Sequence, residues 1–171
     1  MPPDSSADDL QELLSMLVNM GQQVWVDTSG TALDAVLTYP GICIKVNGNE
    51  IGESLGFEVK DVASAKRALK VLDDRGLVAC VITLGAAGAL LATNEGRWHA
   101  QGPRVRVVSP VGSGDSLLGG LVSALDSGKY WPEALRDAVA AGTANVLSAG
   151  GGQFGFQEFK DIREQIQIEA W

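Results

Sequence analysis

Residues 107–116 have the sequence VVSPVGSGDS, and an apolar run over residues 117–125 follows them. A segment rich in β-branched residues enters a Gly-Ser-Gly turn, and the turn enters a helix whose first residues include the carboxylate of Asp115. The first backbone N–H groups of a helix have no intrahelical partner, and the helix dipole adds positive charge there. Because Gly112 and Gly114 carry no Cβ, a phosphate can approach these peptide groups. The stretch therefore predicts a helix start that binds an anion.

Asp115 has two interpretations. Aspartate is favoured at helix starts for local reasons, because its carboxylate can accept a hydrogen bond from a free backbone N–H. Alternatively, a carboxylate beside anion-binding amides is placed to take the proton from a hydroxyl that attacks a phosphoryl group. A Walker loop is excluded, because no Gly-Lys-Ser/Thr follows the glycines. A phosphate site here is therefore of another kind.

Length and composition predict one soluble globular domain over residues 1–171. A chain of 171 residues is long enough to bury a sizeable core. A net charge of −8 disfavours a nucleic-acid groove, which needs a basic stripe. We therefore expect small molecules rather than nucleic acid as partners.

Cysteine usage and the absence of long apolar runs predict a cytoplasmic protein. Cys43 and Cys80 lie in apolar runs without the paired spacing of a zinc or redox motif, so we expect both to be reduced core residues. Residues 1–4 have neither the basic nor the apolar region of a signal peptide. No apolar run reaches the ~18 residues that span a bilayer, so no membrane partner is expected. His99, the only histidine, is expected at the surface.

Apolar strands alternate with amphipathic helices along the chain. Helices are predicted near 8–20, 32–39, 61–74, 115–127, 132–148 and 156–170, and strands near 24–27, 42–46, 77–84 and 104–108, with a hairpin at 89–92 and 97–100. This alternation favours a mostly parallel sheet covered by helices on both faces. The predicted fold class is therefore a three-layer α/β/α arrangement with a small antiparallel hairpin.

Open α/β sheets bind ligands at the carboxyl ends of their strands, because loops and helix N-termini converge there. The polar residues and glycines predicted at those ends are Asn47 and Glu50, then Thr83, Gly85 and Gly88, and lastly residues 112–115. Three strand ends that offer glycine, hydroxyl and carboxylate groups predict one composite site.

At this point the residues carry a resemblance. PVGSGDS, residues 110–116, resembles the second signature of the ribokinase-like (PfkB) sugar kinases, Gly-Ala-Gly-Asp, with Ser113 in place of the alanine. The resemblance implies that the amides of Gly112, Ser113 and Gly114 form an anion hole for the transferring phosphoryl group. It also implies that Asp115 is the catalytic base, and that the cofactors are ATP and Mg²⁺.

Residues 45–50, KVNGNE, are similar to the family's Lys-Pro-Asn-x-x-Glu, with Val46 in place of the proline. An amide and a carboxylate three residues apart can hold the water shell of a magnesium ion beside phosphates. The resemblance implies this role for Glu50 and Asn47, and nucleotide contact for Lys45 and Asn47. The residues alone are equally consistent with a capping box between Asn47 and Glu50.

Two further segments resemble nucleotide-binding parts of the family. Residues 83–89, TLGAAGA, look like its Thr/Ser-x-Gly-x-x-Gly loop, which implies that Thr83, Gly85 and Gly88 border the nucleotide; a plain strand-to-strand turn is the alternative. Residues 136–145 look like the helix along the family's adenine pocket, and ordinary helix packing is the alternative. The residues implied to line that pocket are Val139, Thr143 and Asn145.

Residues 27–30, DTSG, resemble a segment of the family's hexose-phosphate branch, which contains 1-phosphofructokinases and tagatose-6-phosphate kinases. The resemblance covers nearly the whole chain but only the C-terminal, nucleotide-binding half of a family member. It implies an ATP-dependent kinase of a hexose phosphate, whose sugar affinity would need a complementing N-terminal half, and a homo-oligomer is a further expected partner. The alternative function is a non-catalytic nucleotide-binding or interaction module.

Overall fold

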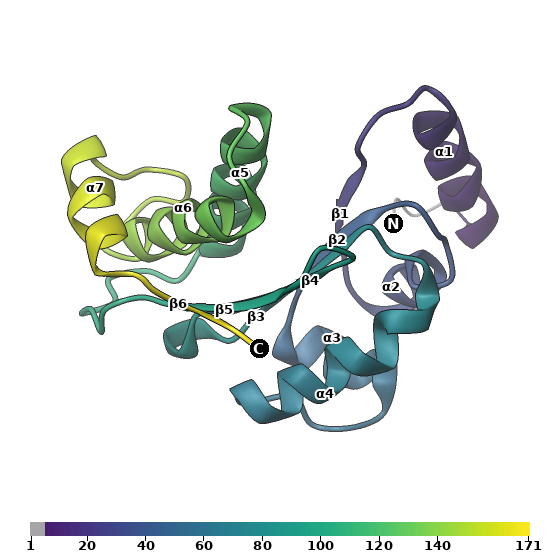
Figure 1. Cartoon of the computed structure of the whole chain (residues 1–171), viewed down its shortest axis with the longest axis horizontal. Coiled ribbons are helices and arrows are strands. Elements are labelled where there is room, and N and C mark those ends of the chain that lie inside the picture. Colours follow the sequence, from purple (N-terminus) through teal and green to yellow (C-terminus); the bar gives the residue numbers. More distant parts are fainter. Residues whose placement is uncertain (1–5) are drawn as a thin grey trace. The chain divides into compact units, whose positions relative to one another are not determined.

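The computed structural model describes residues 6–171 and contains two compact units (Figure 1). The first unit runs up to Leu84 and adds Leu90–Gly96, and the second comprises Gly85–Ala89 and Arg97–Trp171. The strands follow chain order in the sheet, from β1 to β6. That the chain is one domain over residues 1–171 stays a prediction.

The first unit is built on parallel strands. β1 (Trp25–Asp27) pairs with β2 (Cys43–Asn47), and β2 pairs with β3 (Ala79–Thr83), both in parallel. The unit's helices are α1 (Ala7–Asn19), α2 (Gly30–Val36), α3 (Gly48–Leu55) and α4 (Val62–Leu72), with a 3₁₀ turn, η1 (Asp73–Arg75). β2 and β3 are buried along nearly their whole length, as the continuous apolar runs of their sequences predict.

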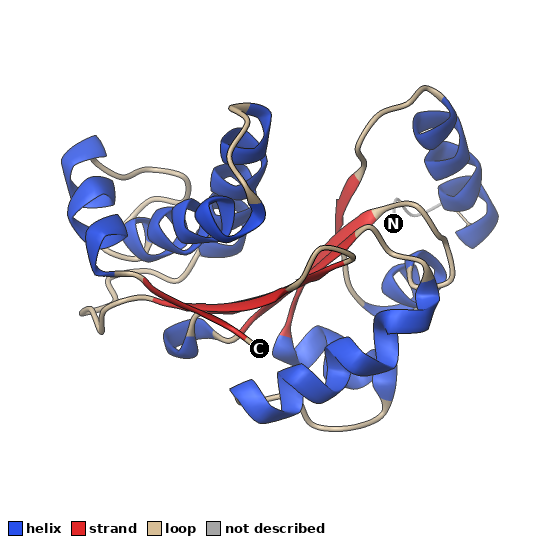
Figure 2. Ribbon diagram, viewed as in Figure 1, coloured by secondary structure: helices blue, strands red, loops and turns tan. Residues whose placement is uncertain are grey.

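The second unit is mostly helical (Figure 2). It contains η2 (Gly85–Ala87), α5 (Ser113–Asp126), α6 (Trp131–Asn145), α7 (Phe156–Gln165) and the antiparallel strands β5 (Arg97–Gln101) and β6 (Gln167–Ala170). Glycines allow α5 and α6 to pack closely. A Cβ on Gly120 would lie 2.9 Å from the Cβ of Ala141, and a Cβ on Gly142 would lie 3.1 Å from the carbonyl oxygen of Ser113.

The predicted α/β class is confirmed, with parallel strands and an antiparallel part in one mixed sheet. β4 (Ala89–Thr93) and β5 occupy the residues predicted for the hairpin, and Thr93 N–H donates to the carbonyl of Gly96 in the turn between them. Within residues 6–171, no helix has the length and apolar character needed to cross a membrane.

Two element predictions were wrong. Residues 104–108 form no strand; Val107 and Val108 are exposed, and the N–H of Val108 donates to the carbonyl of Val146, just past α6, at 2.8 Å. The helix predicted over 156–170 ends at Gln165, where Ile166 has an extended backbone and β6 begins. Alternation in this tail favours a strand, because the exposed Gln167 and Glu169 flank Ile168.

Candidate active site

The start of α5 has the geometry that its sequence predicts. Gly112 is the N-cap residue with φ +77°, a left-handed backbone that glycine adopts without steric cost. The N–H of Ser116 donates to the carbonyl of Gly112 at 2.9 Å, which closes the first helical turn. The amides of Gly114 and Asp115 come before this bond, so helix geometry gives them no intrahelical acceptor. They are therefore available to an anion.

Asp115 lies in the first turn of α5 and is exposed. A carboxylate that takes a proton from a bound hydroxyl must be accessible, and the position of Asp115 meets that requirement. The N-cap residue has no side chain, so the amides of this turn are not capped by one. The N–H of Ser113 donates to the carbonyl of Pro110 at 3.3 Å, so the helix start presents the carboxylate together with the amides of Gly114 and Asp115.

Gly112 also has a packing reason that the sequence did not reveal. A Cβ at this position would lie 2.8 Å from the Cα of Gly151 and 3.1 Å from the nitrogen of Gly152. The glycine loop after α6 therefore packs directly on the cap of α5. The glycine-rich residues 150–152 gave the only signal of this contact.

Asn47 and Glu50 form the capping box that the sequence left open. The side-chain oxygen of Asn47 accepts from the N–H of Glu50 at 3.0 Å, and Glu50 Oε2 accepts from the N–H of Asn47 at 2.7 Å. Both residues are half-buried at the junction of β2 and α3. The capping bond uses only one carboxylate oxygen of Glu50, Oε2. The predicted magnesium role of the pair stays a prediction.

Lys45 has a partner inside the first unit. Its Nζ lies 2.6 Å from Asp27 Oδ2, and its side chain is only 7% exposed. Asp27 and Lys45 are directly paired positions of the parallel strands β1 and β2. This ion pair was not predicted, although aligning the strand ends WVD and CIK in parallel would place the two residues side by side. The predicted contact of Lys45 with a nucleotide stays a prediction.

The loop after β3 is a tight turn that His99 and Gly88 help to define. A Cβ on Gly88, which has φ +83°, would lie 2.0 Å from the carbonyl oxygen of Ala100. His99 Nε2 is 2.8 Å from the carbonyl oxygen of Ala87. His99, which was expected at the surface, is half-buried against this loop. Gly85 is exposed, with open space around it.

Val139, Thr143 and Asn145 lie on α6 and differ in accessibility. Val139 and Asn145 are buried, and Thr143 is half-buried. A Cβ on Gly102 would lie 3.2 Å from Thr143 Oγ1 and 3.6 Å from Val139 Cγ1, so both side chains reach the segment after β5. Helix packing thus accounts for part of their environment. Their predicted contact with the nucleotide is untested.

An ionic cluster on α6 and α7 was not anticipated. The buried Asp137 accepts from Lys129 and, at 2.5 Å, from Arg163 Nε; Arg163 also donates to Glu133 at 2.7 Å. The hydrogen bond to Asp137 raises the pKa of Arg163 above its usual value. Arg136 completes the cluster by donating to Glu133 and to the carbonyl of Ile166. These bonds attach α7 and the start of β6 to α6.

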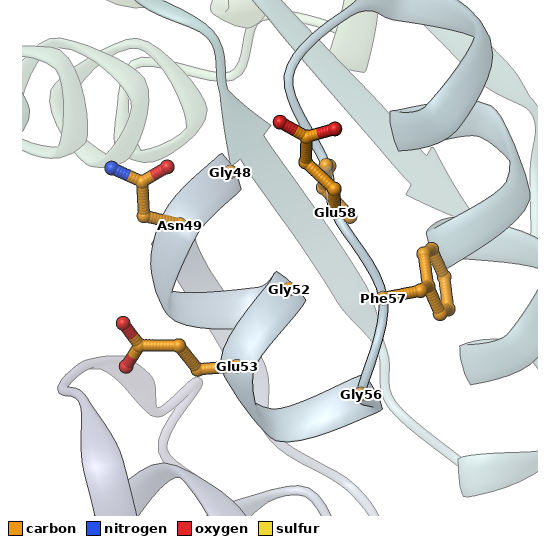
Figure 3. Close-up of a pocket in the computed structure, with 8 residues that line it drawn as sticks. Gly48, Asn49, Gly52, Glu53, Gly56, Phe57 and Glu58 are labelled. Atoms are coloured by element: carbon orange, nitrogen blue, oxygen red, sulfur yellow. The ribbon is translucent and has the colours of Figure 1, made fainter.

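A shallow hollow of about 450 Å³ lies beside α3 (Figure 3). Its lining residues are Gly48, Asn49, Gly52, Glu53, Gly56, Phe57, Glu58 and Val59. Gly48 and Gly52 let residues 57–59 pack against the helix, since a Cβ at either position would lie within 3 Å of the carbonyl of Val59 or Phe57. None of the predicted site residues lines this hollow.

Across residues 6–171, no group of three or more His, Cys, Asp or Glu side chains is placed to hold a metal ion. Magnesium does not need such a group. It keeps several waters and is often held by one or two carboxylates together with substrate phosphates. A single carboxylate such as Glu50, at a strand end beside an amide, therefore fits a water-shell role.

The structure brings the predicted residues together in two groups. In the first unit, Asn47 and Thr83 are paired positions at the carboxyl ends of β2 and β3, and Thr83 Oγ1 donates to the carbonyl of Val46 at 3.4 Å. In the second unit, the start of α5 adjoins the end of α6 through Asn145. The nucleotide contacts predicted for each group stay proposals.

Residues 1–156 match the pfkB family of carbohydrate kinases. The chain belongs to this family. Its ribokinase-like α/β fold is also that of phosphofructokinase-2 from Escherichia coli, solved in complex with potassium, with a TM-score of 0.88 and 28% identity over 96% of this chain and 54% of that one.

Two curated sugar-phosphate kinases of the family are similar to nearly the whole chain. Tagatose-6-phosphate kinase from Staphylococcus epidermidis is 28% identical over 98% of this chain and 55% of its own length. 1-phosphofructokinase from Bacillus subtilis is 28% identical over 93% of this chain and 52% of its own length. The chain thus spans about half the length of the curated relatives it matches.

Proposed function

We propose that the chain carries the nucleotide-binding and catalytic part of an ATP-dependent hexose-phosphate kinase, with Asp115 as the general base. The observation that carries the proposal is the start of α5, where the exposed carboxylate of Asp115 and the amide of Gly114, which has no intrahelical acceptor, occupy one helix turn. The amides of Gly112 and Ser113 are proposed to join the anion hole, and the N–H of Ser113 would then exchange its bond to the carbonyl of Pro110 for one to the phosphoryl group. Donors held in place near a transferring phosphoryl group stabilise its developing charge without reorganising during the reaction. The membership of the pfkB family supports the same reaction type.

The residues proposed to contact the nucleotide come from several strand ends and from α6. They are Lys45, Asn47, Thr83, Gly85, Gly88, Val139 and Thr143, and the family resemblance adds Asn145. When bound, Mg²⁺ would neutralise charge on the nucleotide phosphates, and Glu50 and Asn47 are the residues proposed to hold its waters. The backbone of Asn47 and Glu50 is already fixed by the capping box, so their side chains need little ordering for this role.

The hexose-phosphate class rests on the relatives' names, tagatose-6-phosphate kinase and 1-phosphofructokinase. Because the chain spans about half of their length, we propose that sugar affinity depends on a complementing N-terminal half. Transfer needs the acceptor hydroxyl to be held in line with the phosphoryl group and water to be excluded. Assembly into a homo-oligomer and a cytoplasmic location belong to the same proposal.

The test compares the native chain with Asp115→Asn. ATP binding is measured by calorimetry. ADP formation is measured with Mg²⁺ and a hexose phosphate in the presence of the complementing N-terminal half, because the proposal expects the chain alone to lack sugar affinity. We expect both proteins to bind ATP with similar affinity and ADP formation to fall about 10²- to 10⁴-fold in the variant, as loss of a general base predicts. Asp126→Asn, at the other end of α5, is the matched control and should leave ADP formation unchanged.

Two results would contradict the proposal. Equal ADP formation by the native chain and Asp115→Asn would show that Asp115 is not the general base. ATP binding without ADP formation in either protein would instead support the alternative of a non-catalytic nucleotide-binding module.

A further inference from the structure

Asn145 is a fully buried polar residue at the last position of α6. Its Nδ2 donates to the carbonyl of Val111 at 2.8 Å, and its Oδ1 accepts from the N–H of Gly152 at 2.6 Å and from Ser116 Oγ at 3.2 Å. A buried amide is stable only when its donors and acceptors have partners, and Asn145 uses both atoms. Its polar atoms are therefore engaged by the protein.

The three partners of Asn145 surround the start of α5. Val111 directly precedes the cap residue Gly112, Ser116 lies in the first turn, and Gly152 belongs to the loop that packs on the cap. A second contact supports the same junction, because the N–H of Val108 donates to the carbonyl of Val146 at 2.8 Å. The end of α6 thus holds the chain on both sides of the anion-binding turn.

We infer that Asn145 is a positioning residue for phosphoryl transfer: it fixes the turn of residues 111–116, so that the amides and Asp115 keep one geometry. This inference rests on the proposed function. It assigns Asn145 an action through the backbone, instead of the direct nucleotide contact that the family resemblance implies. A donor that is displaced by about 1 Å from a transferring group can cost roughly 10²-fold in rate, so the placement has catalytic weight.

The side-chain chemistry explains why asparagine suits this position. One planar group must donate to the carbonyl of Val111 and accept from the N–H of Gly152. Aspartate has no donor for the first bond and would place its charge beside a carbonyl oxygen. Alanine would leave the buried carbonyl and N–H without these partners. Both substitutions should therefore loosen the turn.

The experiment compares Asn145→Ala and Asn145→Asp with Leu135→Ala. Leu135 is fully buried in the same helix, ten residues earlier, so its truncation destabilises the fold without removing a bond to the turn. For each protein, the free energy of unfolding, kcat and KM for ATP, and the backbone amide resonances of residues 112–116 and 150–152 are measured under conditions where all proteins are folded.

We expect both Asn145 variants to lower kcat for ADP formation about 10- to 100-fold with a smaller change in KM, and to shift the amide resonances of the two segments. Leu135→Ala should lower the stability but keep kcat within about two-fold and the resonances unshifted. Unshifted resonances in the Asn145 variants, or an equal loss of kcat in Leu135→Ala, would overturn the inference.

The two proposals fail in different ways. If ADP formation does not depend on Asp115, the proposed function is refuted. The amide resonances of the Asn145 variants still show whether Asn145 fixes the turn of residues 111–116. Normal kcat in Asn145→Ala together with a large loss in Asp115→Asn refutes the inference alone.

Discussion

Gly88 has no side chain for two separate reasons, its backbone conformation and the atoms around it. Its φ of +83° is unfavourable for other residues, and a Cβ would lie 2.0 Å from the carbonyl oxygen of Ala100. Gly85, three residues earlier, also has a positive φ of +56°, but no atom lies within 4 Å of a Cβ there. A substitution at Gly85 would therefore cause conformational strain alone, whereas one at Gly88 would cause strain and steric overlap.

We predict that Gly88→Ala destabilises the protein more than Gly85→Ala. Gly85→Ala should cost about 1–2 kcal/mol, the strain of a left-handed alanine. Gly88→Ala should cost roughly 1–3 kcal/mol more, because the backbone at Ala100 must move. Urea unfolding of the two variants measures the difference. Equal costs would show that the loop relaxes freely and that Gly88 is needed only for its φ.

For single residues, the sequence predicted local positions better than it predicted hydrogen-bond partners. The sequence placed Asp115 at an accessible helix start and Asn47 beside Glu50, and both placements agree with the structure. It missed the pairing of Lys45 with Asp27 and the three bonds of Asn145. Three of those partners are 18 to 34 residues away in the chain, and no local pattern encodes such distances. The fourth, Gly152, is 7 residues from Asn145 and lies outside its helix.

Among the elements, the junction of β2 and α3 contains one carboxylate, that of Glu50, which has a structural role and a proposed functional role. Glu50 caps the N–H of Asn47, and the proposed function also gives it the waters of Mg²⁺. Glutamine can make the same capping bond without the charge. Substitution by glutamine therefore separates the two roles.

Glu50→Gln should leave the stability within about 0.5 kcal/mol of the native value, because the capping box is kept. It should raise the Mg²⁺ concentration for half-maximal ADP formation about 10-fold or more, because the carboxylate that would orient the metal's waters is lost. Glu53→Gln, one turn further along α3, is the matched control and should change neither quantity. An unchanged Mg²⁺ requirement in Glu50→Gln would leave this residue with its capping role alone.

Elements with strong periodicity were predicted well, and those set by distant contacts were not. Helices α1, α4, α5 and α6 were located to within three residues at each end, since their apolar spacing and flanking glycine, proline or capping residues are local signals. Strand β6 was missed because it pairs with β5, about 70 residues earlier. Residues 104–108 have β-branched side chains but hydrogen-bond to the end of α6 instead. Tertiary contacts overrode propensity in both places.

For the whole molecule, cooperativity means that the two compact units unfold together, and groups that lie in one unit each can measure this. Both cysteines belong to the first unit, where burial raises the pKa of both thiols, that of Cys43 to about 12. Since the thiolate is the reactive form, neither should react near pH 8 until the first unit opens. The ionic cluster of Asp137 and Arg163 stabilises the second unit. Each unit thus has its own probe.

We predict that Arg163→Met lowers the urea midpoint of both units equally, as a single cooperative domain requires. The loss of two charged hydrogen bonds should cost about 1–3 kcal/mol. Thiol labelling of Cys43 and Cys80 follows the first unit. Tryptophan fluorescence in a Trp25→Phe background follows the second, where Trp98, Trp131 and Trp171 lie. Lys60→Met, which breaks an exposed ion pair, should shift neither midpoint. A shift confined to the fluorescence signal would show that the chain unfolds as two domains.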